Sequence, residues 1–569
     1  MSYMLRVDMS TGEIKKEPVP EKYKYLGGRA LITAIMSDET NPDIDPLGKD
    51  NKFIVCPGLL TGTVAPSSGR LSVGGKSPLT GTMKEANSGG IVSQKMAKAG
   101  IKAIIVENMP VAGKLFMLKI VNGEAELLPA DEYAGVNNYE LTDKLYTRFG
   151  NKIGIVSIGV AGERLYKAAS VQVTSTNGYP ARAAARGGVG ALMGSKGLKA
   201  IVIEQEGTSA VEYADKAAFM SANKKFIEGI LAHPVSGEGM PALGTAVLVN
   251  PVFATGCLPV NNFSSGKFAG VDKISGEHIA EMQASRGGKI GHACNAGCVI
   301  KCSNNIMDKN GEYLTSGFEY ETVVLCGSNC GIDDLDIIAT MDRMCDDIGI
   351  DTMDTGCAIA VAMEAGKAAF GDGEAALAMI REIKDGTEFG NILGNGTEAT
   401  GKFLNVKRIP TVKGQALAAY DPRALKGTGV TYATSPMGAD HTCGNTIGDP
   451  VLVPSEKEGQ VEASGGLQVA MSTFDSLGIC IFASMCIADP QYAVAVADMV
   501  SAFTGEAYTV ETMMGIGAAC LVQEKAYNRG AGIGPEADKL PDFFYNEPLD
   551  TTGSVFDFTQ EELSKALPF

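Results

Sequence analysis

The chain has 569 residues, far more than one hydrophobic core normally serves, so we expect two or three domains. Its net charge of −17 argues against nucleic-acid binding, because nucleic-acid phosphates select basic proteins. No apolar run in the sequence is long enough to cross a bilayer, so no membrane span is expected.

The cysteine content and the N-terminal sequence both favour a reducing compartment. Thirteen cysteines would be prone to unwanted disulfides in an oxidising one. The first residues, MSYMLRVDMSTGE, lack the apolar core of a signal peptide. We therefore expect an anaerobic, cytoplasmic protein.

The predicted secondary structure changes along the chain from strands to helices. Short apolar segments between glycine and proline turns predict strands at 4–8, 53–55, 103–106, 115–120, 153–156 and 200–203. The polar segment 204–212 predicts a linker. Beyond it, apolar residues three to four positions apart predict helices at 334–346, 353–370, 373–384 and 464–477. The fold class is therefore α+β, with a β-rich domain at 1–206 and two mainly helical domains at 215–405 and 406–569.

Two six-residue segments, 346–351 and 475–480, share the pattern D-x-x-G-I, and each follows an apolar helical segment. Gly349 and Gly478 are each predicted to end a helix in a left-handed turn. The leading aspartates Asp346 and Asp475 then offer acceptor oxygens near a helix end. This duplication suggests a ligand that is bound twice, in pseudo-symmetric fashion. Because the second copy ends in Cys480 instead of an aspartate, that side is also predicted to hold a metal cluster.

Three further cysteines, Cys294, Cys298 and Cys302, lie four residues apart. Together with the distant Cys480 they can form the four-thiolate shell of an iron–sulfur cluster. Zinc sites usually pair C-x-x-C knuckles, and this spacing differs. A zinc site and buried structural cysteines remain the alternatives.

Glycine-rich segments with basic residues predict sites for a polar anionic ligand. The segment 182–196 suggests a phosphate cradle of backbone N–H groups, although it does not match a Walker A loop. An ordinary tight turn is the alternative. In the region 66–90, small residues would let a bulky ligand approach the main chain, and Arg70, Lys76 and Asn87 are candidate oxyanion ligands. Arg29, in the Gly-Gly-Arg string, is a third candidate arginine.

Taken together, these motifs resemble the aldehyde:ferredoxin oxidoreductase family of tungsten enzymes, over nearly the whole chain. Both D-x-x-G-I segments match the family's pair. The other matching segments are 27–29, 58–63, 76–81, 86–90, 186–196, 318–322, 327–334, 420–427 and 438–442.

The resemblance implies tungsten, with molybdenum as the alternative, held by the dithiolenes of two pyranopterins, and a [4Fe–4S] cluster beside one pterin. It implies that the β-rich domain binds pterin, and that a Mg²⁺ ion is an optional bridge between the pterin phosphates. The implied cluster ligands are Cys294, Cys298, Cys302 and Cys480. The implied pterin-binding residues are Arg70, Asn87, Gly89, Gly90, Arg186, Gly187, Gly188, Asp346, Asp351, Asp475, Gly478 and Ile479.

The sequence departs from the family pattern in two places. The usual cysteine run is C-x-x-C-x-x-x-C, whereas the first spacing here is one residue longer, so the loop at 295–297 is expected to bulge. Some dimeric relatives bind an interface iron through an E-x-x-H helix. No histidine lies between His292 and His441, so a homodimer would lack that iron.

The implied reaction oxidises an aldehyde, or a related small oxo compound, to a carboxylic acid with water as the oxygen source. A proton acceptor and a carbonyl-polarising donor are needed beside the metal. His441 is the main candidate, against the alternative of a core histidine. Glu319 and Glu321 are its candidate partners, and an extended segment would place both on one face.

No nucleotide-binding βαβ unit is evident, so the implied electron acceptor is a ferredoxin or a ferredoxin-like subunit. Lys289, Lys301 and Lys309 are the candidate docking patch, against the alternative of an ordinary solvated surface. Two other functions stay open: a reductive catalytic subunit resembling those of benzoyl-CoA reductase complexes, and a non-catalytic electron-transfer protein.

Overall fold

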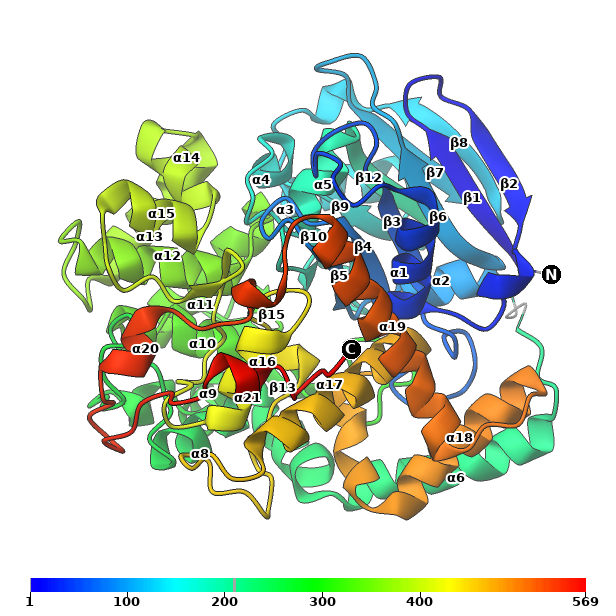
Figure 1. Cartoon of the computed structure of the whole chain (residues 1–569). Helices are drawn as coiled ribbons and strands as arrows, with labels where there is room; N and C mark the ends of the chain where they lie inside the picture. The colour runs from blue at the N-terminus through cyan, green and yellow to red at the C-terminus, as the bar shows by residue number, and fades with distance from the viewer. Residues whose placement is uncertain (1, 208–210) are drawn as a thin grey trace.

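A computed structural model describes residues 2–207 and 211–569 of the chain (Figure 1). Two six-stranded sheets occupy the N-terminal part, and helices dominate from Lys216 onward. The predicted α+β class, with a β-rich region followed by helical ones, is confirmed. The domain boundaries themselves remain a prediction. No helix in the described ranges has both the length and the apolar character needed to span a membrane.

The first sheet has the strand order β2-β1-β6-β3-β4-β5. Strand β1 pairs antiparallel with β2 and parallel with β6, and the remaining neighbours pair antiparallel. Its strands are β1 (Tyr3–Asp8), β2 (Ile14–Pro18), β3 (Phe53–Pro57), β4 (Leu71–Lys76), β5 (Met83–Ser88) and β6 (Ile101–Glu107).

The second sheet repeats this topology with the order β11-β10-β9-β12-β7-β8, and each pairing has the same direction. Its strands are β7 (Phe116–Val121), β8 (Glu124–Pro129), β9 (Gly154–Ser157), β10 (Val171–Val173), β11 (Arg182–Ala184) and β12 (Leu198–Glu204). The two sheets pack through a shared apolar core that includes Leu5, Val73, Leu118 and Ile201.

The N-terminal region is thus an internal duplication, which the sequence analysis missed. Equivalent helices accompany the sheets: α1 (Gly28–Glu39) matches α3 (Asn138–Phe149), and α2 (Val92–Lys98) matches α5 (Val189–Ser195). A sequence signal exists in the last strand of each half. Residues 100–107 read GIKAIIVE and residues 197–204 read GLKAIVIE, an offset of 97 (197 minus 100).

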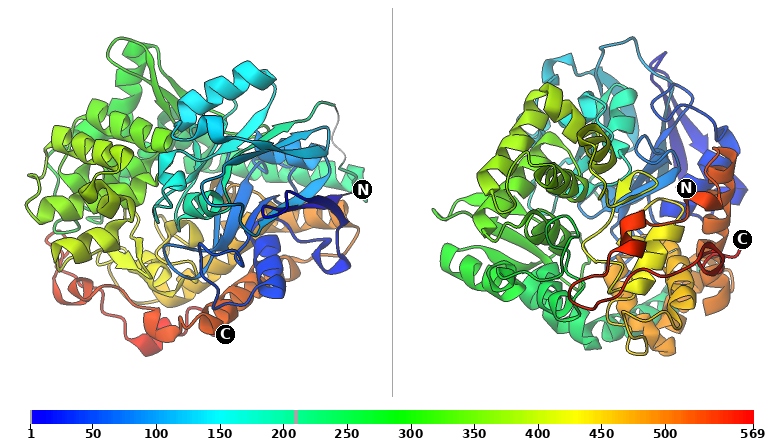
Figure 2. Two further views of the ribbon diagram at one scale, coloured as in Figure 1. Left: turned by 90° about the horizontal axis from the view of Figure 1, so that it is seen from above. Right: turned by 60° about the vertical axis from the view of Figure 1, so that its left-hand side comes forward.

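The helical region packs against one side of this β-rich part (Figure 2). Its longer helices are α6 (Lys216–Ala232), α9 (Gly276–Arg286), α11 (Leu335–Ile348), α12 (Thr352–Glu364), α13 (Gly373–Asp385), α16 (Lys426–Thr434), α17 (Gln460–Leu477), α18 (Pro490–Thr504) and α19 (Val510–Gly530). Shorter helices are α4 (Val160–Glu163), α7 (Met240–Leu243), α8 (Val249–Ala254), α10 (Tyr320–Leu325), α14 (Glu388–Gly394), α15 (Thr397–Leu404), α20 (Asp542–Asn546) and α21 (Gln560–Leu563). Small sheets are formed by β13 (Lys289–His292), β14 (Ser303–Met307) and β15 (Tyr313–Ser316), and by β16 (Thr411–Val412) and β17 (Gln415–Ala416).

All six predicted strands and all four predicted helices are present, with small changes at their ends. Helix α12 ends at Glu364 instead of 370, because Gly366 takes a left-handed conformation (φ +80°) that stops the helix. The predicted linker begins where β12 ends at Glu204, and its residues 208–210 lie outside the described ranges.

The helices bring the two D-x-x-G-I segments to equivalent places. Helix α1 packs against α17 and α19, and α3 packs against α11. Each D-x-x-G-I segment therefore faces the N-terminus of an equivalent helix in one half of the duplicated β-rich region.

Candidate active site

The first aspartate turn (346–351) and the second aspartate turn (475–480) have the predicted backbone. Helix α11 ends at Ile348 and Gly349 follows with φ +73°, while α17 ends at Leu477 and Gly478 follows with φ +77°. Both glycines are left-handed, which L side chains rarely adopt. The leading aspartates Asp346 and Asp475 are buried in the last turn of their helices.

The two turns dock on equivalent loops of the β-rich region through matching pairs of main-chain hydrogen bonds. In the first turn they run from Ser170 N to Gly349 O (2.8 Å) and from Asp351 N to Ala168 O (3.0 Å). In the second turn they run from Arg70 N to Gly478 O (3.1 Å) and from Cys480 N to Ser67 O (2.9 Å). The pseudo-symmetry expected from the sequence is therefore present in the backbone, and the duplicated sheets explain it.

Two glycines make this docking possible, Gly58 in one half and Gly159 in the other. A Cβ atom on Gly58 would lie 2.1 Å from Gly478 Cα, and a Cβ atom on Gly159 would lie 2.3 Å from Ile348 O. Both contacts are with main chain, which cannot yield as a flexible side chain does.

We expect Gly58→Ala and Gly159→Ala each to destabilise the protein by about 1–3 kcal/mol, the usual range for overpacking, and to lower bound pterin. Gly466→Ala is the matched control, because Gly466 lies in α17 with open space at its Cβ position. Thermal unfolding and pterin fluorescence would measure both effects. Wild-type Tm and pterin content in both variants would show that close docking of the turns is unimportant.

The second aspartate turn holds a chain of hydrogen bonds that reaches β4 and β5. Asn87 Nδ2 donates to Asp475 Oδ1 (3.1 Å), and Arg70 Nε donates to Asn87 Oδ1 (2.6 Å). A second bond joins Arg70 Nη2 to Asn87 O (2.9 Å). Burial raises the pKa of Asp475 to about 6, while Arg29 and Arg70 oppose the rise. The structure thus brings together three of the predicted pterin-binding residues.

The first aspartate turn leads into α12, where Asp351 is the N-cap. Its Oδ1 accepts a hydrogen bond from Met353 N (2.9 Å), but its buried Oδ2 has no hydrogen-bond partner in the described structure. Arg186 Nε lies 3.6 Å from this oxygen and is likewise buried without one. Burial raises the pKa of Asp351 to about 6, against the lowering effect of Arg186. These unpaired atoms fit a polar ligand better than a closed core.

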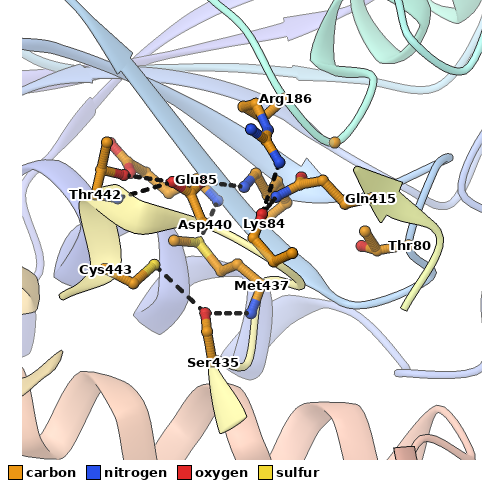
Figure 3. A network of polar contacts seen from close by, with 12 residues as sticks. Thr80, Lys84, Glu85, Arg186, Gln415, Ser435, Met437, Asp440, Thr442 and Cys443 are labelled. Carbon is orange, nitrogen blue, oxygen red and sulfur yellow. Dashed lines mark hydrogen bonds and ion pairs between the residues drawn. The ribbon is translucent and has the colours of Figure 1, made fainter. Parts of the chain in front are cut away.

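Arg186 and Lys84 place positive charge near Asp440 (Figure 3). Arg186 Nη2 donates to the carbonyl oxygens of Ala416 and Ala439, and Lys84 Nζ lies 3.3 Å from Asp440 Oδ2. Burial opposes the change, but Lys84, Arg186 and His441 together lower the pKa of Asp440 well below its usual range. An ionised carboxylate therefore stands next to His441 in the sequence.

Two lysines in the predicted anion-binding segments already donate hydrogen bonds to main-chain carbonyls. Lys76 Nζ donates to Pro42 O (2.5 Å) and Ile44 O (2.9 Å), and Lys196 Nζ donates to Gly48 O (2.9 Å). The prediction that Lys76 binds a ligand oxyanion is therefore wrong, because buried carbonyls already use its amine. The prediction that Lys196 closes a phosphate cradle fails for the same reason.

The glycines of the same regions pack on protein atoms. A Cβ atom on Gly187 would meet Lys84, and one on Gly188 would meet Lys167 O. On the β5 side, a Cβ atom on Gly89 would meet Cys294 Sγ, and one on Gly90 would meet Thr174 O. These glycines let chain segments approach one another beside Arg186 and Asn87, and their predicted contact with pterin remains a prediction.

His441 and Glu321 form the one predicted catalytic pair that the structure brings together. His441 Nε2 lies 3.2 Å from Glu321 Oε1, and Glu321 Oε2 accepts a hydrogen bond from Ala419 N (2.7 Å). Burial raises the pKa of Glu321, while His441 opposes the rise. The contact of Glu321 Oε1 with His441 Nε2 is close but lacks hydrogen-bond geometry, and within the described chain His441 Nδ1 is buried without a hydrogen-bond partner. The pair can hold a proton and still has atoms available to a ligand.

Glu319 does not share this position, so the prediction that both glutamates lie on one face is wrong. The segment is helical instead of extended: Glu319 is the N-cap of α10 and Glu321 lies in its first turn. Glu319 accepts from Thr245 Oγ1 (2.6 Å) and lies 3.4 Å from Arg182 Nη1. Its carboxylate is therefore directed toward Arg182, away from His441.

The four cysteines predicted to bind a cluster come together from two distant segments. A hydrogen bond with Cys298 and burial raise the pKa of Cys294. Burial is the main cause that raises the pKa of Cys302 and of Cys480, and the neighbouring Cys294 adds to both. In residues 2–207 and 211–569, no three His, Cys, Asp or Glu side chains converge on a single metal-ion position. In a four-iron cluster each thiolate binds a different iron, so its ligands surround the cluster without meeting at a point.

The cysteine loop forms a tight turn and is fixed to the β-rich region, while its predicted bulge relative to the family pattern remains a prediction. A turn joins Cys298 N to Asn295 O (3.3 Å), with Gly297 left-handed at φ +80°. Further bonds run from Gly90 N to Cys294 O (3.0 Å) and from Ser67 N to Gly297 O (3.0 Å). Ser67 also receives the Cys480 N–H, so it holds both cysteine segments together.

Three residues of the centre were missed or misjudged from the sequence. Arg29 was predicted to bind an oxyanion, but its fully buried guanidinium pairs with Glu524 and Asp475. Glu524 carries no local signal, because only the tertiary fold brings α19 to Arg29. Glu85 is buried in β5 with Oε1 unpartnered, and burial raises its pKa to about 8. Its position in the Glu-Ala-Asn string beside Asn87 was the available signal.

Comparison with known proteins identifies the family. The model of the aldehyde ferredoxin oxidoreductase N-terminal domain matches residues 4–205, and that of domains 2 and 3 matches residues 221–568. The chain belongs to the aldehyde ferredoxin oxidoreductase family. The tungsten-containing aldehyde ferredoxin oxidoreductase of Pyrococcus furiosus is 36% identical, over 96% of this chain and 91% of that protein. The enzyme of the same name from Thermococcus kodakarensis is 35% identical over the same shares.

The fold is also found among solved structures. The active site complex BamBC of benzoyl coenzyme A reductase with 1,5-dienoyl-CoA has a TM-score of 0.81 to this chain. The match covers 99% of this chain and 93% of that one, at 19% sequence identity. At this identity the likeness concerns the fold. As a member of the family, this protein is an oxidoreductase, and family membership implies a tungsten pyranopterin cofactor.

Proposed function

We propose that this protein oxidises aldehydes to carboxylic acids, with water as the oxygen source. The two electrons leave one at a time through a [4Fe–4S] cluster on Cys294, Cys298, Cys302 and Cys480. The observation that carries the proposal is the pair of buried Glu321 and partly buried His441, which has atoms without hydrogen bonds and lies next to Arg186 and Asp440. A homodimer without an interface iron, in an anaerobic cytoplasm, is part of the proposal. None of the thirteen cysteines forms a disulfide, so Cys294, Cys298, Cys302 and Cys480 are available to bind the cluster.

The residues available for a bis-pyranopterin centre fit its chemistry. Asp346, Asp351, Asp475 and Asn87 offer acceptors and a donor to pterin rings, and Arg70 and Arg186 offer positive charge to their phosphates, with Mg²⁺ as an optional bridge. The remaining predicted pterin contacts are the main chain at Gly89, Gly90, Gly187, Gly188, Gly478 and Ile479. When bound, the tungsten centre supplies the two-electron redox chemistry.

The protein's own contribution is proton handling and substrate orientation. The overall reaction turns an aldehyde and water into an acid, two protons and two electrons, so a nearby base is required. Glu321 Oε1 can accept a proton, and its buried position favours holding it. With both ring nitrogens protonated, His441 can donate from Nδ1 to the substrate carbonyl while Nε2 faces Glu321.

A two-part assay tests this proposal. Metal analysis and pterin fluorescence on anaerobically purified protein should find tungsten, iron and pterin. Aldehydes with viologen dyes should give turnover, whereas aromatic thioesters with a reductant should not. Turnover of thioesters alone would favour a reductive function, and a protein with iron but without pterin would favour a non-catalytic electron carrier.

The electron partner should dock on the lysines near the cysteine loop, since Lys289, Lys301 and Lys309 are all exposed. We expect changing all three to glutamate to slow ferredoxin reduction about tenfold or more at low salt. Reduction of small viologen dyes should be unchanged. The control reverses three other exposed lysines, Lys384, Lys402 and Lys407, in the segment α13–α15. Equal slowing in both triple variants would rule out a local docking patch.

A further inference from the structure

A fully buried ion pair lies directly behind the second aspartate turn. Arg29 on α1 and Glu524 on α19 are both 0% exposed, and they form two parallel bonds: Nε to Oε1 (2.8 Å) and Nη2 to Oε2 (2.7 Å). Thr33 Oγ1 also donates to Glu524 Oε1 (3.2 Å). The third guanidinium nitrogen, Arg29 Nη1, lies 3.4 Å from Asp475 Oδ2. Arg29 therefore joins two carboxylates from segments far apart in the sequence.

Folding stability alone does not account for this arrangement. Desolvation offsets most of the attraction within a buried pair, and apolar residues of similar volume often stabilise a core equally well. Glu524 orients Arg29 through two of its nitrogens, which leaves the third directed at Asp475. In this geometry Glu524 fixes Arg29, and Arg29 in turn fixes the position of the Asp475 carboxylate.

The first aspartate turn lacks such a support, although its backbone is equivalent. At the position of Arg29, the second residue of its helix, α3 has the neutral Tyr139, whose buried hydroxyl has no hydrogen-bond partner in the described residues. Asn138, the first residue of α3, donates from Nδ2 to the main-chain oxygen of Asp346 (3.0 Å). Within the described residues, Asp346 forms no ion pair with a basic side chain at 4.0 Å or less, although Arg182 and Arg343 act on its carboxylate from further away. Burial and the neighbouring Asp342 raise the pKa of Asp346 well above its usual range. The two turns thus have equivalent backbones, but only the leading aspartate of the second turn lies beside a buried arginine.

The groups facing Asp475 can be named from every element packed on it. They are Arg29 and Glu524, Arg70 ahead of β4, Glu85 on β5, and Asp440 ahead of a short 3₁₀ segment. Burial and Asp440 raise the pKa of Asp475, and Arg29 is the strongest group opposing them. Removing Arg29 therefore extends protonation of Asp475 to higher pH.

We infer that Arg29 and Glu524 are positioning residues that keep Asp475 ionised and aimed at its pterin. The inference rests on the proposed cofactors. An ionised Asp475 only accepts hydrogen bonds, so it would bind N–H groups of the pterin. Asp475 also connects through Asn87 and Arg70 to the Gly478 carbonyl, two residues before Cys480. Its charge therefore acts on the cluster as well.

The test separates this role from a purely structural one by replacing both members of the pair. Arg29→Gln with Glu524→Gln removes both charges and leaves no unpaired buried ion, so the double variant should fold and retain tungsten, iron and pterin. The readout is the cluster midpoint potential, followed by EPR as a function of pH. In the double variant the pH-dependent step should move up by at least one unit, a tenfold change in proton affinity, and the potential at pH 7 should become more positive.

Two further variants and a control complete the design. Asp475→Asn should abolish the pH-dependent step, and adding Arg29→Gln with Glu524→Gln to the Asp475→Asn protein should cause no further change in the pH profile. Arg29→Lys keeps the charge and should stay near wild type. The control is Asp421→Asn with Arg423→Gln, because that pair is equally buried and bidentate but lies outside the centre (Nε to Oδ1 2.9 Å, Nη2 to Oδ2 2.6 Å).

Each outcome supports or overturns the inference. A wild-type potential and pH profile in a fully loaded double variant would overturn it. If the double variant does not fold, Asp475→Asn decides: an unchanged pH profile overturns the inference, and a lost step supports it. Wild-type protein without pterin or cluster would instead overturn the proposed function, before any variant is compared.

Discussion

Replacing Cys480 with alanine is expected to remove the iron–sulfur cluster, although this residue lies 178 positions beyond Cys302 (480 minus 302). The thiol faces Cys294 across two chain segments that Ser67 holds together. A cluster with three thiolates loses one iron readily, since the fourth iron then has no protein ligand. We expect iron and acid-labile sulfide to fall to less than about half and the cluster EPR signal to be lost or altered.

Cys486→Ala provides the control for this change. Cys486 is buried a short distance further along, and its thiol donates to Ala483 O (3.4 Å), so it is occupied within its own segment. Its variant should retain full iron and the native EPR signal. A Cys480→Ala protein with full iron and an unchanged spectrum would exclude Cys480 as a ligand.

His441→Ala and Glu321→Gln are expected to lower kcat by about 10²–10⁴-fold while tungsten, pterin and iron remain bound. Each change removes one member of the 3.2 Å pair, and with it the proton acceptor or its oriented partner. Glu319→Gln should have a smaller effect on kcat, because its carboxylate contacts Thr245 and Arg182. Near-normal kcat in the His441→Ala protein, with full cofactor content, would show that His441 has no catalytic role and is an ordinary core residue.

The pH dependence of kcat should report the same pair. Burial raises the pKa of Glu321, and a base must be deprotonated to act. Activity should therefore be present above this pKa and fall as the pH drops through it, at a higher pH than for an ordinary glutamate. In Glu321→Gln this acidic limb should disappear, and its persistence would assign the titration to another group.

Helix ends and buried strands could be predicted from the sequence, because each is determined by residues close together in the chain. The left-handed glycines Gly349 and Gly478 could be placed because a helix end requires such a residue. Strands β3 and β6 could be placed because the predicted segments 53–55 and 103–106 are continuous apolar runs. The family motifs named Asp475, Asn87 and Arg70 only as pterin-binding residues, and the structure places these three side chains in one hydrogen-bond chain.

The rest depends on tertiary packing that no local pattern records. Strand β5 contains Lys84, Glu85 and Asn87, so its composition resembles a polar loop, and it is a strand because it pairs with β4. Lys76 and Lys196 look like free cations in sequence, yet the fold surrounds their amines with carbonyls. Glu319 and Glu321 differ in direction because a helix begins between them, which two alternating acidic residues do not reveal.

The placement of the second aspartate turn also sets the order in which the molecule can be assembled. The duplicated β-rich region is complete by residue 204, so it can fold while the chain is still being synthesised. Asp475, Cys480 and Glu524 are made only near the end of the chain, and the second docking surface stays uncovered until then. The centre is therefore open to large cofactors through most of synthesis, and α17 and α19 cover it last. Insertion of pterin and cluster should precede that final folding step, so the mature, buried centre would be difficult to reload without partial unfolding.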